Sequence, residues 1–91
     1  MKLTRINNDT NGNPRYVCHF LELVNDSDRE IAESKSDIFN GVSCTSELYV
    51  IALKKSRALG GKKYHNKSYG GGIVFQYYNE NELEQDIKKL L

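Results

Sequence analysis

Apolar residues gather in short runs along the chain, and polar or glycine-rich stretches separate these runs. Leu3 and Ile6 belong to an N-terminal stretch that ends in Asp-Thr-Asn-Gly-Asn-Pro at 9–14. Asn-Gly tolerates the positive φ angles of a tight turn, and proline cannot donate to a strand ladder, so a strand should begin after Pro14. The β-prone run 15–24 therefore predicts the second, central strand of a hairpin.

A polar stretch from 25 to 40 interrupts this pattern. It contains five acidic and two basic residues and only isolated apolar positions. We expect a long, exposed, acidic connection, with one short helical turn around 29–33 as an alternative.

Two helices are predicted, each from a polar N-cap followed by apolar residues at helical spacing. The first begins at residue 45 or 46 and runs to 59, where Gly60 and Gly61 follow; its apolar residues fall on one face. The second begins after Asn79 or Asn81 and runs to the C-terminus, with glutamates early and lysines late, as the helix dipole favours.

Two further strands are predicted between these helices, at 62–65 and 73–78. Three glycines at 70–72 separate them and permit a bulge or a close backbone approach. The order is β-β-α-β-β-α. We expect an α+β fold with an antiparallel sheet of three to four strands and two helices packed on one face.

Chain length and charge limit what this fold can do. The 91 residues should form a single domain over 1–91. A chain of this size buries only roughly 60–65% of the surface that its unfolded form exposes, so a homo-oligomer that adds burial is one expectation. The net charge of +1 gives no global attraction to nucleic acid or an anionic membrane. No apolar run approaches the roughly 20 residues that span a bilayer, and the N-terminus lacks a signal pattern. We expect a cytoplasmic protein with no membrane partner.

The segment 54–69 is rich in cations and tyrosine and contains no acidic residue. It holds six of the thirteen Lys and Arg residues of the chain. Cations neutralise phosphates and tyrosines stack on unpaired bases, so the segment suits single-stranded DNA or RNA, and it suits an acidic protein surface equally. A solvated helix end and hairpin without any ligand would give the same composition. The candidate binding residues are Lys54, Lys55, Arg57, Lys62, Lys63, Tyr64, His65, Lys67 and Tyr69.

No catalytic or metal-binding pattern stands out. His19 lies in an apolar strand, where a packed or edge residue with one hydrogen-bond partner is expected. His65 lies in the basic segment and could gain a proton or donate to phosphate. The cysteines Cys18 and Cys44 lack metal-ligand spacing and are expected to be reduced, structural thiols. The glycine run opens onto a strand, unlike a phosphate-binding loop. We expect no enzyme, no metal and no cofactor.

Three segments carry a resemblance to known proteins. The sequences NGNPRYVCHF at 11–20, ALKK at 52–55 and GGKKYHNKSYGGGIVFQ at 60–76 resemble small uncharacterised proteins of bacteriophages and mobile elements. The resemblance implies a phage-borne binding protein that modulates or inhibits a host machine, of the anti-CRISPR or another anti-defence type. The leading hypothesis is therefore a non-enzymatic accessory protein that binds a host protein or protein–nucleic-acid complex. The alternative is a small RNA- or single-stranded-DNA-binding domain.

Overall fold

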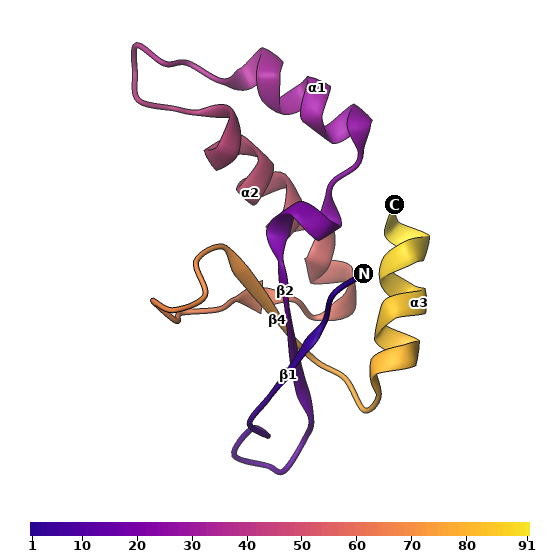
Figure 1. The fold of residues 1–91 in the computed structure, drawn as a ribbon. Helices are drawn as coiled ribbons and strands as arrows, with labels where there is room; N and C mark the ends of the chain where they lie inside the picture. Colours follow the sequence, from indigo (N-terminus) through magenta and orange to yellow (C-terminus); the bar gives the residue numbers. More distant parts are fainter.

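A twisted antiparallel sheet carries helices on one face, and a pair of helices extends beyond one end of the sheet (Figure 1). The computed structural model describes residues 1–91. The strands are β1 (Thr4–Ile6), β2 (Arg15–His19), β3 (Lys62–Lys63) and β4 (Gly72–Gln76), in the spatial order β1-β2-β4-β3. The helices are α1 (Asp26–Lys35), α2 (Cys44–Ser56) and α3 (Glu80–Leu90), with short 3-10 helices η1 (Phe20–Leu23) and η2 (Arg57–Leu59). The predicted α+β class with an antiparallel sheet is confirmed.

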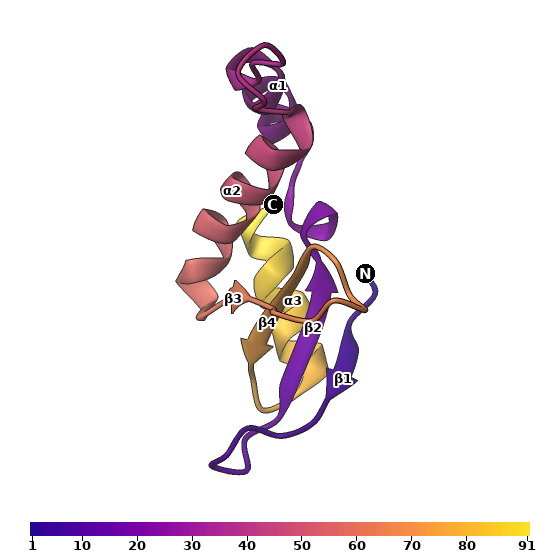
Figure 2. The ribbon, with the colours of Figure 1, turned by 90° about the vertical axis from the view of Figure 1, so that its left-hand side faces the viewer.

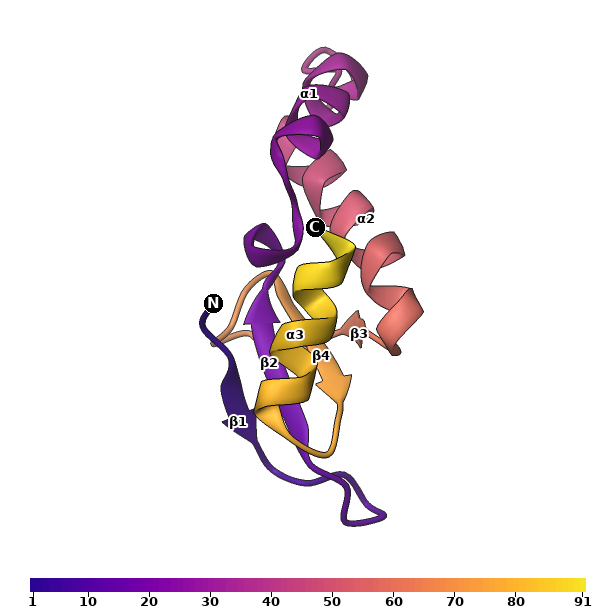
Figure 3. The same ribbon diagram turned by 90° about the vertical axis from the view of Figure 1, so that its right-hand side faces the viewer.

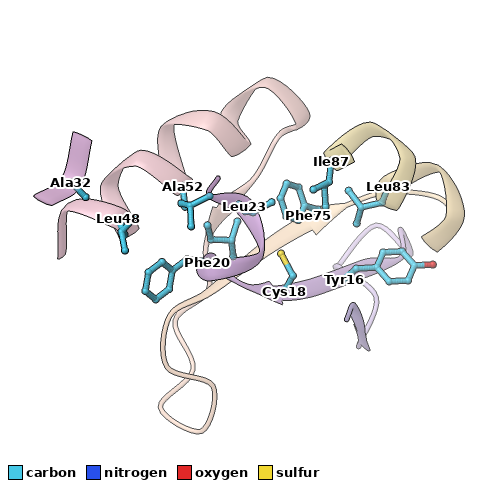
Figure 4. Close-up of a cluster of buried hydrophobic side chains, with 12 residues drawn as sticks. Tyr16, Cys18, Phe20, Leu23, Ala32, Leu48, Ala52, Phe75, Leu83 and Ile87 are labelled. Atoms are coloured by element: carbon cyan, nitrogen blue, oxygen red, sulfur yellow. The ribbon is translucent and has the colours of Figure 1, made fainter. Parts of the chain in front are cut away.

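The hydrophobic core lies between the sheet and the helices α2 and α3 (Figures 3 and 4). In the pairing of β2 with β4, Tyr16 lies opposite Phe75 and Cys18 lies opposite Ile73. Alternate residues of a strand point to opposite faces, so these four side chains share one face. Buried residues of the two helices close the core over them: Leu48 and Ala52 from α2, and Leu83 and Ile87 from α3. The central position predicted for the second strand is also confirmed, because β2 lies between β1 and β4.

Side-chain caps fix where the two predicted helices begin. The Ser43 hydroxyl accepts a hydrogen bond from the N–H of Ser46 at 3.2 Å, so α2 starts slightly before the predicted residues 45 or 46. The Asn79 side chain accepts from the N–H of Glu82 at 2.8 Å and starts α3. A capping side chain satisfies one of the backbone donors that a helix start leaves unpaired.

The region 25–40 contains a third helix, α1, so the expectation of an exposed connection there is wrong over Asp26–Lys35. The Asn25 side chain accepts from the N–H of Asp28 at 2.9 Å, and the Asp28 carboxylate accepts from the N–H of Asn25 at 3.0 Å. This reciprocal capping box starts the helix. Ala32 is fully buried, and Lys55 of α2 forms an ion pair with Asp28. Packing on α2 therefore stabilises a helix that the weak apolar pattern of this region did not predict.

The ion pair also changes the acidity of Asp28. Burial raises the pKa of this carboxyl. The hydrogen bonds from Lys55 and from the Asn25 backbone, together with the charge of Lys55, lower the pKa by more, so it lies below its usual value. The ionised carboxylate is the form that the α1–α2 contact stabilises.

The predicted strand 15–24 ends early, at His19. The His19 imidazole accepts a hydrogen bond from the N–H of Leu21 at 3.3 Å and caps η1. The 3-10 turn buries Phe20 and Leu23 together and leaves Leu21 exposed, which an extended strand could not do. The later strands are also shorter than the predicted 62–65 and 73–78. β3 ends at Lys63, where the chain leaves the sheet to form a loop, and β4 ends at Gln76, before the chain turns into α3.

That loop, residues 64–71, folds across the end of the sheet face that lies opposite the helices (Figure 2). Gly72 points to this face, and a Cβ atom there would meet the side chains of Tyr69 at 2.7 Å, Val17 at 3.1 Å and Tyr64 at 3.3 Å. The two tyrosines therefore help to bury Val17, which is fully inaccessible.

No helix is both long enough and apolar enough to cross a bilayer.

The two thiols are free, and their surroundings differ. Cys18 is fully buried, and burial, with a further contribution from the Glu22 carboxylate, raises the pKa of its thiol to about 12. Only the thiolate reacts rapidly with thiol reagents. We expect one thiol of the native protein, Cys44, to react with Ellman's reagent and the second to react only after unfolding. Two rapidly reacting thiols in the native protein would contradict the buried position of Cys18.

Candidate binding groove

An open groove lies between the first half of α2 and the loop that joins β3 to β4. Its volume is about 770 Å³. We call it the aromatic groove. Its aromatic lining residues are Phe20, Tyr49, Tyr64 and Tyr69; Figure 4 shows Phe20 between α2 and the loop. The remaining lining residues are Thr45, Ser46, Val50, Lys63, His65, Asn66, Lys67, Gly70 and Gly71.

Two aromatic pairs form the walls of the groove. Phe20 and Tyr49 pack edge to face, with ring centroids 5.2 Å apart at 83°. Tyr64 and Tyr69 pack at 6.4 Å and 66°. Offset and edge-to-face geometries are the favourable ones for aromatic rings, so the walls are ordered before any ligand arrives. Burial raises the pKa of the Tyr49 hydroxyl above its usual value.

Asn66 organises the loop that carries the second pair. Its side-chain amide donates to the Tyr64 hydroxyl at 3.1 Å, and its side-chain oxygen accepts from the N–H of Ser68 at 2.8 Å. Its backbone carbonyl accepts from the N–H of Tyr69 at 3.1 Å. One residue thus fixes the turn from Tyr64 to Tyr69 through three hydrogen bonds.

The groove attracts anions, because cations line it and no Asp or Glu does. Lys63 lies over the Tyr49 ring, with Nζ 6.0 Å from the centroid, while His65 and Lys67 are exposed on the loop. Thr45 and Ser46 belong to the first turn of α2, the positive end of the helix dipole. Aromatic faces beside fixed positive charge suit a ligand that is both apolar and anionic.

The structure brings five of the nine sequence-predicted site residues into this groove: Lys63, Tyr64, His65, Lys67 and Tyr69. The other four lie elsewhere. Lys55 is held by Asp28, and Lys62 lines a smaller hollow of about 220 Å³ that also contains Asp9 and Arg15. Lys54 and Arg57 are exposed and line neither hollow. Neighbouring residues of a strand point to opposite faces, which separates Lys62 from Lys63.

Sequence reasoning missed the lining residues that come from η1 and α2. Phe20 was counted as a strand residue, whereas η1 places it at the base of the groove. Tyr49 and Val50 follow Thr45 and Ser46 at a spacing of four, which puts all of them on one side of α2. Val50 is 43% exposed. In the sequence, Tyr49 and Val50 fall outside the predicted apolar face of this helix, and that was the available signal for this wall.

The lining residues offer aromatic faces for stacking, cationic hydrogen-bond donors and hydroxyl groups, all of which can bind a ligand. No three His, Cys, Asp or Glu residues lie close enough together to hold a metal ion. His19, as expected, is a packed residue with one hydrogen-bond partner, the N–H of Leu21.

Residues 1–90 match the family described as Staphylococcus phage terminal repeat-encoded protein TreK. The chain belongs to this phage protein family. The phage origin implied by the resemblance of segments 11–20, 52–55 and 60–76 is therefore confirmed, and the description of the family states no activity. No curated protein and no solved structure is significantly similar to the chain.

Proposed function

We propose that this phage protein is a non-enzymatic binding protein that captures a segment of a host protein in the aromatic groove and thereby modulates a host complex in the cytoplasm. An anti-CRISPR or other anti-defence role is one form that this function can take. The observation that supports the proposal is the groove itself, which joins four aromatic rings and three basic residues with no acidic one. Preformed aromatic surfaces of this kind act as anchors in protein interfaces.

The groove defines the chemistry of the segment it would bind. Phe20, Tyr49 and Val50 form an apolar wall, with Phe20 at its base, against which an aromatic or aliphatic side chain can pack. Lys63 and Lys67 lie at the same groove and would pair with carboxylates on either side of that anchor. The partner segment is therefore expected to be acidic, with at least one large apolar residue.

Single-stranded nucleic acid is the second candidate, because four aromatic rings could stack on bases. Affinity for nucleic acid, however, depends on how many phosphates the protein neutralises. The groove assembles only Lys63 and Lys67, with His65, whereas Lys54, Arg57 and Lys62 lie outside it. Two phosphate contacts give a logarithmic salt slope of only about −1.4 on a single strand. This separation of the cations favours a protein ligand.

Affinity capture from nuclease-treated Staphylococcus lysate tests the proposal with two charge-matched double variants. Lys63→Glu with Lys67→Glu reverses the charge of the groove, and Lys54→Glu with Arg57→Glu makes the same change outside it. We expect the wild type and the outer variant to enrich the same host protein, and the groove variant to lose it by about tenfold or more, as for other interfacial charge pairs. The partner would then be purified and the binding reconstituted.

Two results would count against a host protein as the ligand. The first is the absence of any host protein that distinguishes the groove variant from the outer variant. The second is micromolar or tighter binding of short single-stranded RNA or DNA that weakens as the salt concentration rises and disappears in the groove variant. The second result would establish the nucleic-acid alternative in its place.

A further inference from the structure

The turn between α1 and α2 holds the two most exposed large apolar side chains of the protein. Phe39 and Ile38 have relative exposures of 102% and 85%. Single exposed apolar residues are common, but a fully exposed phenylalanine beside an exposed isoleucine at the end of a projecting helical pair is typical of an interaction site. We call residues 37–42 the apolar tip.

The apolar tip is a structured turn. Asp37 and Val42 form an isolated antiparallel bridge, with backbone hydrogen bonds of 2.7 and 2.8 Å. The Asp37 carboxylate accepts from the N–H groups of Phe39 at 3.1 Å and Asn40 at 3.2 Å. An ordered turn loses little conformational entropy when it binds, so Phe39 is already positioned as an anchor.

The apolar tip has the properties that the aromatic groove would recognise. Asp37 lies next to the exposed pair, and the stretch 25–40 carries five acidic against two basic residues. The groove carries Lys63, His65 and Lys67 with no acidic residue, around aromatic walls. One molecule thus contains both an apolar turn that carries one aspartate and a basic, aromatic groove.

The two features are neighbours in the fold. Val42 lies just before α2, and the first lining residues of the groove, Thr45 and Ser46, follow in the first turn of that helix. The apolar tip and the loop 64–71 project on the same side of the molecule (Figures 1 and 2). A two-fold axis between tip and groove would therefore allow two copies to make both contacts at once, the closed arrangement most common among oligomers.

We propose that two copies of this chain form a symmetric dimer in which the Phe39 and Ile38 side chains of each copy fill the aromatic groove of the other. Asp37 of one copy then faces Lys63 and Lys67 of its partner. The inference deepens the proposed function and rests on the ligand chemistry assigned to the groove. The apolar tip of the second copy and the host segment would occupy the same groove. A host partner would therefore compete with the tip and dissociate the dimer.

Sedimentation velocity over a wide protein concentration range tests the dimer. We expect the wild type to dimerise reversibly. Phe39→Ser removes two aromatic anchors from the symmetric dimer, one from each copy, and should raise the dimer dissociation constant about a thousandfold or more. Tyr78→Ser is the matched control, because Tyr78 is 69% exposed and lies outside both tip and groove, and it should leave the dissociation constant unchanged.

A mixing experiment separates a reciprocal contact from any other dimer. Phe39→Ser lacks the tip but keeps the groove, and the double variant Lys63→Glu with Lys67→Glu lacks the groove charge but keeps the tip. Neither variant should dimerise with itself, whereas an equimolar mixture should form heterodimers through the one intact contact. A wild type that stays monomeric, a dimer that survives Phe39→Ser, or a mixture without heterodimers would each overturn the proposal.

Host capture distinguishes this failure from failure of the proposed function. Phe39→Ser leaves the groove intact, so it should capture the host partner at least as well as the wild type. If the wild type is monomeric while the groove variant still loses the host protein, only the dimer is wrong. If the dimer behaves as expected and no host protein depends on the groove, only the proposed function is wrong. Loss of host capture in Phe39→Ser would assign the apolar tip to the host protein and overturn the dimer.

Discussion

Replacing Gly71 by alanine is expected to lower the free energy of unfolding by about 2–4 kcal/mol, from left-handed backbone strain and overpacking together. Gly71 has a φ of +76°, which L residues rarely adopt. A Cβ atom there would lie 2.8 Å from Cδ1 of Phe20 and 3.2 Å from Nε2 of His19. Because Phe20 lies at the base of one wall of the aromatic groove, the same substitution should also displace that wall.

Gly70→Ala is the matched control for this prediction. Gly70 has no positive φ, and a Cβ atom there would meet nothing within 4 Å. Its substitution should change the free energy of unfolding by no more than about 0.5 kcal/mol. Urea denaturation followed by circular dichroism measures both variants. Equal effects at Gly70 and Gly71 would show that the loop does not approach Phe20 as described.

Gly61→Ala is expected to cost about 3 kcal/mol, the upper part of the range for overpacking a buried site. A Cβ atom at Gly61 would lie 2.5 Å from both Cβ and Oγ of Ser56 and 2.8 Å from Cε1 of Phe75. Ser56 cannot move away easily, because its carbonyl accepts from the N–H of Gly61 at 2.8 Å and its hydroxyl donates to the carbonyl of Leu53 at 2.8 Å.

A double-mutant cycle with Ser56→Gly isolates this contact. Ser56→Gly alone removes a helical side chain and its hydrogen bond and should cost about 1 kcal/mol. Combined with Gly61→Ala, it removes the closest clash, so the double variant should be more stable than the sum of the single effects implies by about 1 kcal/mol or more. Strict additivity in chemical denaturation would contradict close contact between residues 56 and 61.

The sequence predicted those elements whose signals are local. Polar caps and helically spaced apolar residues located α2 and α3, and turn chemistry at 9–14 located the first hairpin. The helix α1 was missed because its capping box uses Asn25 and Asp28 in place of the usual Ser or Thr and Glu, and because Ala32 is its only buried residue. Its remaining support, Lys55 of α2, is distant in the sequence.

The candidate site could be predicted only in its contiguous part. The loop residues from Lys63 to Tyr69 stayed together because they are neighbours in the chain. Phe20 and Tyr49 joined them through the packing of η1 and α2, which no local pattern encodes. Lys62 and Lys63 illustrate the opposite case, since the alternation of a strand sends two adjacent lysines to different hollows.

The strand order β1-β2-β4-β3 has a consequence for the time at which this protein can acquire its structure during synthesis. The two central strands are β2 at residues 15–19 and β4 at residues 72–76. β2 therefore lacks its central partner until β4 has been synthesised. Before then the chain can form the β1–β2 hairpin, the α1–α2 pair and the packing of η1 on α2, but not the pairing of β2 with β4. The chain must lose the conformational entropy of closing this long loop before the contacts between β2 and β4 can form. The nascent chain should therefore remain without its complete core until β4 has left the ribosome.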